Sequence, residues 1–471
     1  MENKTKDLTK EIFPLLMSSI EKFHWYDSRP SHPNFIFGRL EFRIHIDPVL
    51  AKEAWRIALS RQPLAGVKPE KVKRRWHWGA KSQTNERGST GSFNHHEAES
   101  SPEPWNFEDD ELRLTISSHL EMRTGGRARP TGELHGKLVE RTTLVYFAVH
   151  HAISDGAGAI LVVNEWLAIY ANLESGRSGT AGLQRLEADR LRARNHLGLF
   201  RWNYLKHIFQ QPVALFGATK FIFRKTVDLT IQKDVSDGDA RLYPAIVGRW
   251  LDAEAVRCLG RESGRLRVTL NSIMLGRLFV SLSRFLARDG EDHRRDWLRV
   301  ILPISIREMS DRRMPAANRT TIVQLDRRAD ELALSDGFYQ NLDREIRIIR
   351  GWQLDKIFLI CIRLLSTVEP LFRKVAGNRK SRGTVVFTNL GEPFRKLLKT
   401  QSQLSRGSFG QFDLVGPVRE GTPLNYTVAR HGERLRVSLH YDSRVFSANR
   451  AEDLLESYAS ELVGGTPRES E

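Results

Sequence analysis

The chain has 471 residues, 40% of them hydrophobic and 28% charged, with a formal net charge of +16. Its ten Trp and 23 Phe exclude a disordered chain, and the length predicts two lobes of roughly 200 residues each. No run of about 18 consecutive apolar residues occurs, so no membrane-spanning helix is expected. Residues 1–6 are polar and no apolar segment follows them, which predicts a cytoplasmic protein without a signal peptide.

The positive charge limits the classes of partner. It attracts anions, which include nucleic acid, phospholipid headgroups and phosphate-bearing co-substrates. The basic residues are mostly arginine, are scattered along the chain, and accompany no RNA-binding or helix-turn-helix signature. We therefore expect no nucleic-acid partner, and the other two anions remain open.

Neither the cysteines nor the histidines predict a metal site. Cys258 and Cys361 lie far apart and match no metal or redox spacing, which predicts two buried thiols in a reducing compartment. Isolated histidines and carboxylates likewise lack coordinating spacing, so no metal is expected.

The predicted first lobe spans residues 1–190. It opens with a helix over residues 9–23, followed by a strand over residues 40–46, where apolar and polar side chains alternate. Asp47 then caps a helix with Pro48 in its first turn. The polar composition of residues 68–104 predicts a long surface excursion, a hairpin with a flexible tip.

The most apolar strand of this lobe leads directly into a histidine motif. Residues 142–149 form a nearly continuous apolar run, which predicts a central strand buried on both faces. The motif occupies residues 150–156, and apolar residues at helical spacing follow it. The motif therefore lies on a strand-to-helix turn, where α/β proteins often place their chemistry.

Residues 191–240 are predicted to cross between the lobes. Within them, residues 197–225 mix aromatic and basic side chains. This mixture predicts either an interfacial segment that rests on anionic lipid or a buried crossover helix with a basic outer edge. Peripheral contact with an anionic membrane therefore remains open.

The predicted second lobe, residues 241–471, repeats the opening of the first: a strand over residues 246–251 leads to Asp252, which caps a helix. The overall prediction is an α/β fold of two α+β lobes, each with two layers. Further predicted elements are a helix over 271–288, strands over 300–304, 385–388 and 435–439, and a final helix capped by Ser447.

The histidine pair has two interpretations. Along a strand, alternation directs the imidazoles of His150 and His151 to opposite sides, so one can face a cleft while the other packs. Gly156 and Gly158 allow the backbone to turn tightly before the helix. The alternative is a satisfied core histidine beside a turn aspartate, Asp155.

The order His150, His151, three further residues, Asp155 and Gly156 resembles the active-site motif of the CoA-dependent acyltransferase superfamily. Its members have the chloramphenicol acetyltransferase-like fold and include condensation domains of peptide synthetases, plant acyltransferases and wax ester synthase/diacylglycerol acyltransferases. The plant "DFGWG" motif is absent, which argues against a plant-type member. Three further stretches resemble the superfamily: residues 26–64, residues 302–307 followed by Asn318, and residues 387–391.

The resemblance implies two lobes of this fold with the active site in a channel between them. His151 would be the general base, with His150 and Asp155 in the catalytic set. Asp155 would hold the turn by pairing with Arg307. The residues that it implies for co-substrate and oxyanion contacts are Gly156, Thr388 and Asn389, and those that support the site are Arg307 and Gly158.

The implied reaction moves an acyl group, other than an aminoacyl group, from a thioester to an alcohol or amine. The donor would be acyl-CoA as a co-substrate, with no bound cofactor. Direct transfer without a covalent acyl-enzyme is expected, because no Gly-x-Ser-x-Gly elbow occurs and neither cysteine adjoins a histidine.

Two alternatives remain open. The donor would instead be carried in trans by an acyl carrier protein, or the chain would be a catalytically silent, condensation-like binding protein. The expected acceptor is a small molecule or a lipid, and the expected state is a monomer.

Overall fold

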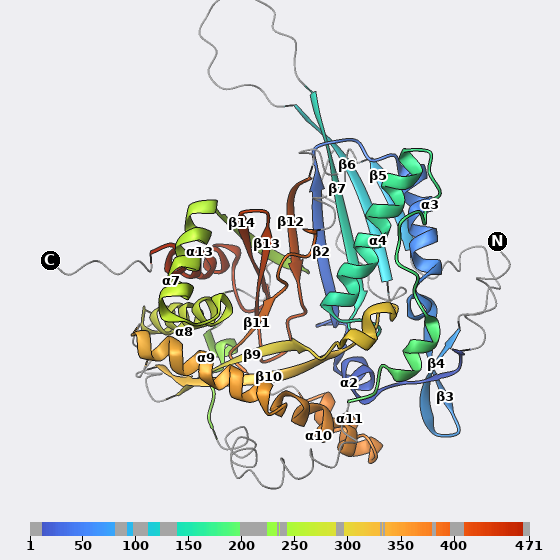
Figure 1. The fold of residues 1–471 in the computed structure, drawn as a ribbon. Coiled ribbons are helices and arrows are strands. Elements are labelled where there is room, and N and C mark those ends of the chain that lie inside the picture. The colour runs from blue at the N-terminus through green and yellow to red at the C-terminus, as the bar shows by residue number, and fades with distance from the viewer. Residues whose placement is uncertain are drawn as a thin grey trace, which may run out of the picture.

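Two mixed sheets, each covered by helices, make up the described part of the chain in this computed structural model (Figure 1). A smaller sheet of three strands accompanies them. The described residues are 12–80, 92–97, 112–122, 139–197, 224–232, 235, 243–288, 296–329, 332, 335–378, 383–395 and 409–464.

The first sheet has the strand order β12-β2-β7-β6-β5, and β7 lies between β2 and β6. The central strand predicted for residues 142–149 is confirmed, because it forms the C-terminal part of β7. Helices α3 and α4 pack beside this sheet (Figure 1), and Trp55 and Trp166 are buried in its core. The bounds are β2 Phe35–Phe42, β5 Ser92–Glu97, β6 Leu112–Met122, β7 Val139–His150, β12 Phe409–Val415, α3 Pro48–Ser60 and α4 Gly156–Glu174.

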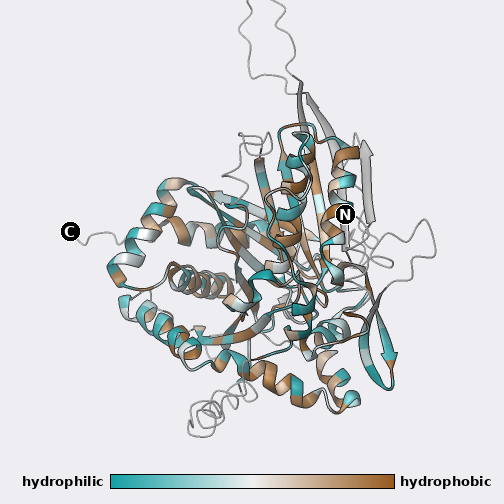
Figure 2. Ribbon diagram, turned by 45° about the vertical axis from the view of Figure 1, so that its right-hand side comes forward, coloured by the Kyte–Doolittle hydropathy of each residue, from teal (hydrophilic) through white to brown (hydrophobic). Residues whose placement is uncertain are grey.

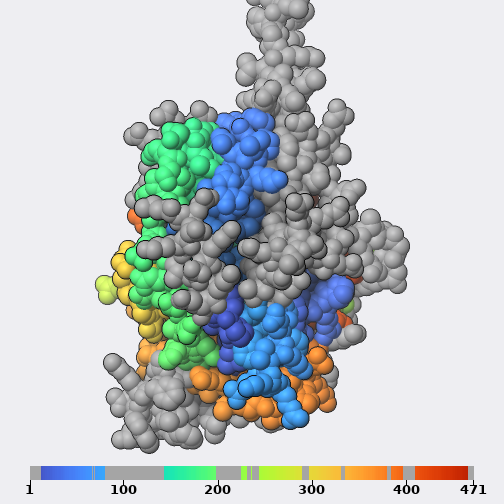
Figure 3. All heavy atoms as spheres, turned by 90° about the vertical axis from the view of Figure 1, so that its right-hand side faces the viewer, coloured from blue at the N-terminus to red at the C-terminus, as the bar shows by residue number. Residues whose placement is uncertain are grey.

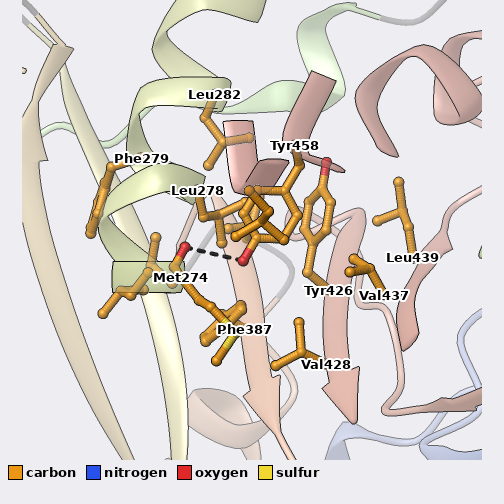
Figure 4. Close-up of a cluster of buried hydrophobic side chains, with 14 of the residues drawn as sticks. Met274, Leu278, Phe279, Leu282, Phe387, Tyr426, Val428, Val437, Leu439 and Tyr458 are labelled. Atoms are coloured by element: carbon orange, nitrogen blue, oxygen red, sulfur yellow. Dashed lines mark hydrogen bonds between the residues drawn. The ribbon is translucent and has the colours of Figure 1, made fainter. Parts of the chain in front are cut away.

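The second sheet has the strand order β10-β9-β11-β13-β14-β8. Its core lies under α8 and α13, where the Tyr458 hydroxyl donates a 3.0 Å hydrogen bond to the Met274 carbonyl (Figure 4). Ser447 and Asp252 cap α13 and α7, as predicted. The bounds are β8 Ala245–Leu251, β9 Trp297–Ser305, β10 Thr320–Arg328, β11 Val385–Asn389, β13 Leu424–His431, β14 Arg434–Tyr441, α7 Ala253–Leu266, α8 Leu270–Arg288, α9 Asp336–Gly351 and α13 Ala448–Gly464.

One strand from the C-terminal part of the chain completes the first sheet. β12 pairs antiparallel with β2, although residues 241–471 were predicted to form the second lobe. Its buried Asp413 accepts hydrogen bonds from Arg39 of the first sheet (3.1 Å) and from Arg436 of the second (2.8 Å). The two sheets are thus joined by a strand and by its carboxylate, and the lobe boundaries at 190 and 240 stay predictions.

The predicted helix over residues 9–23 is interrupted within the described residues, and residues 9–11 lie outside them. Residues 12–18 are not a continuous helix and include β1, Leu15–Leu16, whereas α2 spans Ser19–Asp27. Ser18 forms a capping box with Glu21, and this box fixes the start of the helix. Pro14 cannot donate a backbone hydrogen bond, which explains why the predicted helix over 9–23 does not form in this part.

The predicted excursion over residues 68–104 is only partly a surface feature. β3, Val67–Val72, and β4, Arg75–Ala80, form the expected hairpin. Trp78 of this hairpin is fully buried, however, and donates a 3.0 Å hydrogen bond to Glu21. β5 also belongs to the first sheet, so treating the whole excursion as a surface loop was wrong, because one aromatic anchor and one strand belong to the lobe.

Two short helices lie beside α2, and 3-10 segments occur in other connections of the chain. α10, Ile357–Leu365, and α11, Glu369–Ala376, pack on α2 through Leu359, Ile362 and Phe372. Residues 198–223, which make up most of the predicted crossover, lie outside the described residues. The predicted interfacial stretch, residues 197–225, falls almost entirely within this undescribed range. The 3-10 segments are η1 Pro63–Gly66, η2 Ala188–Ala193, η3 Leu229–Gln232, η4 Met309–Arg313 and η6 Leu354–Lys356.

Two helices, α4 and α8, are long and apolar enough to cross a membrane by length and composition alone. Their most apolar windows are 61% and 72% buried inside the protein, as expected of core helices. Cys258 is half-buried and Cys361 is exposed, and both are free thiols. The prediction of two buried thiols was therefore wrong, because each lies on the outer side of an amphipathic helix.

Candidate active site

The histidine motif forms the turn between β7 and α4. β7 ends at His150, and the backbone N–H of Ile153 closes the turn on the His150 carbonyl at 3.0 Å. Asp155 is the N-cap of α4 and accepts a 2.9 Å hydrogen bond from the Gly158 N–H. A side chain at Gly158 would clash, because its Cβ would lie 2.1 Å from Ser154 Oγ.

His151 is held by residues from both halves of the chain. Its backbone N–H donates to the Asn34 carbonyl at 2.8 Å. From the connection between β9 and β10, Asn318 Nδ2 donates to the His151 carbonyl at 2.8 Å and lies 3.2 Å from His151 Nδ1. The His24 ring of α2 stacks on the His151 ring, with centroids 4.0 Å apart and planes 13° apart. The His151 side chain remains partly exposed.

His150 has different surroundings from those of His151. It is buried among aromatic rings, with Trp25 at 5.5 Å and Phe35 at 4.9 Å between centroids. Its Nδ1 accepts a 3.1 Å hydrogen bond from the Ala152 N–H. The structure therefore places His150 as a packed member of the turn.

Both imidazoles are kept neutral near pH 7. Burial, with a smaller contribution from the neighbouring His151, lowers the pKa of His150 to about 3. Burial also lowers the pKa of His151 below its ordinary value. A hydrogen bond to its own backbone and the negative charges of Asp155 and Asp27 oppose this shift without reversing it. A neutral imidazole is the form that accepts a proton.

Asp155 is buried, with 1% of its surface exposed, and the predicted pairing with Arg307 is present. Arg307 Nη1 donates to Asp155 Oδ2 at 2.6 Å. The same oxygen accepts hydrogen bonds from the Arg319 backbone N–H at 2.7 Å and the Thr320 hydroxyl at 2.8 Å. Burial alone would raise the pKa of Asp155, but Arg307 and these hydrogen bonds lower it below its ordinary value.

The residues predicted for co-substrate contacts lie at the end of β11. Asn389 Nδ2 donates to Asn271 Oδ1 at 3.1 Å, and Asn389 Oδ1 accepts from the Gly391 N–H at 2.9 Å. The next residue, Leu390, reaches α4, because a Cβ on Gly156 would lie 3.5 Å from its side chain. Thr388 is partly exposed on the same strand. Among the described residues, no hydrogen bond links Thr388 or Asn389 to His151.

Two open depressions border the residues that hold His151. One, of about 310 Å³ including open solvent, is lined by residues of α2 and α10 and by Asn318 and Thr320. The other, of about 290 Å³, is lined in part by Asp27 and Asn34. Within the described ranges, no group of three or more His, Cys, Asp or Glu side chains could hold a metal ion.

The sequence reasoning missed His24 and assigned no role to Asn34 or Asn318. His24 lies 127 positions before its stacking partner, and no motif spacing relates the two. Asn318 entered only through the resemblance of the segment after Arg307. No strand was predicted at β10, so no local signal pointed to Asn318.

Comparison with solved structures gives the fold. The chain is similar to the first condensation domain of the calcium-dependent antibiotic synthetase, with a TM-score of 0.64, 16% identity and 95% of each chain covered. It is also similar to polyketide synthase associated protein 5 from Mycobacterium tuberculosis, with a TM-score of 0.61, 13% identity, and 95% and 97% of the two chains covered.

A third similar structure is the TRI3 trichothecene 15-O-acetyltransferase from Fusarium sporotrichioides, with a TM-score of 0.63, 12% identity, and 95% and 93% of the two chains covered. No protein-family model and no curated protein sequence matches the chain. At these identities the likeness shows the fold alone, which is the two-lobed chloramphenicol acetyltransferase-like fold predicted from the motif.

Proposed function

We propose that this chain is an acyltransferase that moves an acyl group from a thioester donor, acyl-CoA, to an alcohol or amine. The observation that carries the proposal is a neutral, partly exposed imidazole, His151, held by Asn34 of one half and Asn318 of the other. A fixed base at the junction of two lobes suits a reaction between two substrates, because positioning makes their encounter effectively unimolecular.

His151 acts as general base through Nε2. Its Nδ1 faces the Asn318 amide, and a hydrogen bond to its own backbone contributes to its pKa. With the ring proton on Nδ1, where the hydrogen bond to the His151 backbone holds it, Nε2 carries no hydrogen and takes the proton of the acceptor hydroxyl or amine while the acceptor attacks the thioester carbonyl. Collapse of the tetrahedral intermediate breaks the carbon–sulfur bond, and the proton on Nε2 passes to the departing thiolate. No acyl-enzyme forms in this route.

The oxyanion of the intermediate needs hydrogen-bond donors. The Gly156 N–H belongs to the first turn of α4, where backbone donors have no partner within the helix and the helix dipole favours negative charge. Asn389 would have to exchange its Asn271 contact for the oxyanion, whereas Thr388 would reach it from the same strand. Gly156 is therefore the donor that we favour.

Asp155 holds the site and does not contact the substrates. Both of its carboxylate oxygens accept hydrogen bonds from the chain. Because it ties α4 to the β9–β10 connection, it also fixes the position of Asn318 relative to His151. We assign Asp155 and Arg307 as positioning residues, with Gly158 allowing the close packing.

The donor and the acceptor have separate support. The positive charge suits the phosphates of CoA and would equally suit an acidic carrier protein acting in trans. The likeness to a condensation domain favours the carrier, and the likeness to a 15-O-acetyltransferase favours an alcohol acceptor. Turnover of free acyl-CoA, compared with turnover of the same acyl group on a carrier protein, decides between the donors.

The test of the proposal is His151→Ala assayed by thiol release from a panel of acyl-CoA thioesters with alcohol and amine acceptors. A loss of about 10²–10⁴-fold is expected, which is the usual contribution of a positioned base. His45→Ala, at an exposed histidine of the same lobe, serves as the matched control and should keep full activity. Undiminished turnover by His151→Ala would contradict the assignment of His151 as the general base.

A different result is expected if the chain is a catalytically silent binding protein. Wild-type protein would then release no thiol from any CoA or carrier thioester, yet would still bind one of them. Calorimetric titration with a non-hydrolysable thioester analogue separates this case from an inactive preparation.

A further inference from the structure

Helices α10 and α11 expose a stripe of apolar side chains to solvent. Of the eleven large hydrophobic side chains that are exposed among the described residues, six fall within residues 348–375. Four of these lie at the end of α10, in the turn that follows it and on α11, and Figure 2 shows hydrophobic residues along these helices at the lower edge of the molecule. We call these four the apolar stripe: Leu364 (67% exposed), Val368 (53%), Leu371 (46%) and Val375 (40%).

The contact between these helices and α2 does not use the residues of the apolar stripe. Their buried side already packs on α2 through Leu359, Ile362 and Phe372. The outer side of α10–α11 therefore also carries apolar side chains, and these are exposed. Monomeric soluble proteins rarely expose a contiguous apolar patch without a binding role.

Basic side chains surround the apolar stripe. Arg363, Arg373 and Lys374 are exposed on the same two helices. The one carboxylate within residues 357–376 is Glu369, which is only partly exposed. It accepts hydrogen bonds from Trp76 Nε1 at 3.1 Å and from the Tyr26 hydroxyl. No fully exposed carboxylate therefore accompanies the stripe on these helices.

The tip of the β3–β4 hairpin extends this surface. Figure 3 shows the hairpin beside α10–α11 on one face of the molecule, and the Trp76–Glu369 hydrogen bond joins the two. The tip turns at Lys73 and Arg74, and Val72 at its edge is 37% exposed. Its exposed basic residues are Lys71, Lys73, Arg74 and Arg75.

We infer that the apolar stripe and the hairpin tip together dock the protein on an anionic phospholipid bilayer. Apolar side chains flanked by Lys and Arg match the boundary between acyl chains and negatively charged headgroups. The net charge of +16 adds long-range attraction to such a surface. The side chains of the apolar stripe would insert among the acyl chains, and the basic residues of the hairpin tip would bind the negatively charged headgroups.

Docking in this way brings the depression that is lined by α10 and Asn318 close to the lipid. Leu359, Ile362 and Arg363 of α10 line the same depression as Asn318, which holds His151. This step rests on the proposed function: a lipid-borne alcohol or acyl chain would enter beside Asn318, which holds the base. The docking itself does not depend on catalysis.

The experiment is co-sedimentation of the full chain with vesicles of phosphatidylcholine alone or mixed with phosphatidylglycerol. Strong, salt-sensitive binding to the mixed vesicles is expected, with weak binding to the neutral ones. Lys73→Gln with Arg74→Gln should weaken binding about 25-fold, because each basic residue near an anionic surface contributes about fivefold. Leu364→Ser with Leu371→Ser should weaken it about tenfold or more, even in high salt.

Val49→Ser with Met309→Ser is the matched control. These two side chains are more exposed, at 75% and 77%, but belong to neither the apolar stripe nor the hairpin tip, so binding should not change. The inference is overturned if anionic vesicles fail to bind wild-type protein. It is also overturned if both serine pairs act alike, or if the stripe variant changes only self-association or capture of an acidic protein.

Turnover of a soluble thioester separates the two proposals. The stripe variant should keep wild-type thiol release while it loses vesicle binding. Absent thiol release with intact vesicle binding would instead reject the proposed function and leave the docking surface in place.

Discussion

The two halves of the chain contain the same kind of helix cap with different surroundings. β7 and β8 each lead to an aspartate that caps the next helix: Asp155 accepts from the Gly158 N–H at 2.9 Å and Asp252 from the Ala255 N–H at 2.8 Å. Asp252 is exposed. Asp155 is buried and also binds Arg307, Arg319 and Thr320 from the other half of the chain.

The difference shows what turns a helix cap into part of a site. The cap itself is a local feature that any strand-to-helix turn supplies. At Asp155, a partly buried arginine and two further donors attach that cap to the β9–β10 connection, which also supplies Asn318. The turn of the second half has no such attachment to its aspartate among the described contacts.

The largest expected contrast is in stability. Asp155→Ala should lower the free energy of unfolding by about 3–5 kcal/mol, because it leaves the Arg307 charge and two donors without their buried partner. Asp252→Ala should cost about 1 kcal/mol, the usual value of a helix cap. Urea unfolding of both variants measures the difference, and equal losses would contradict the special role of the Asp155 contacts.

A smaller effect is expected at Asn318. Asn318→Ala removes the hydrogen bond to the His151 carbonyl and the contact with Nδ1, so we expect a loss in kcat of about tenfold, or about 1.4 kcal/mol, with little change in KM. Asn341→Ala on the surface of α9 is the control and should match wild type. A change confined to KM would show that Asn318 binds substrate instead of positioning the base.

His24 should give the smallest kinetic effect. His24→Leu removes the stacked ring and should lower kcat by about two- to fivefold, since ring pairs contribute about 0.5–1 kcal/mol. His24→Phe keeps a ring in place and should restore most of the activity. If His24→Phe is as impaired as His24→Leu, the 3.2 Å contact between His24 Nδ1 and Asn34 Nδ2, and not the stacked ring, is what positions His151.

Sequence reasoning succeeded where the signal was local. The apolar run of β7, the caps at Asp47 and Asp252, and the Asp155 turn all depend on residues within a few positions of one another. The Asp155–Arg307 pair was reached only through the resemblance, because 152 positions separate the two residues.

The features that were missed depend on tertiary packing. β12 leaves its own half of the chain to pair with β2, and nothing in its sequence encodes this choice. Trp78 lies in a polar stretch but packs in the hydrophobic core beside the first sheet, where Glu21 accepts its N–H. His24 joins the site only because α2 packs between α10 and the motif turn, and no spacing rule could have found it.

The pH dependence of kcat/KM, measured side by side for wild type and His151→Ala, tests the role of His151 most directly. The base must be deprotonated and its pKa is lowered, so wild-type activity should hold as the pH falls below 6.5 and decline only at the lower pKa of His151. His151→Ala should show residual activity without that decline. A wild-type decline centred at or above pH 6.5, or the same decline in both proteins, would contradict His151 as the general base.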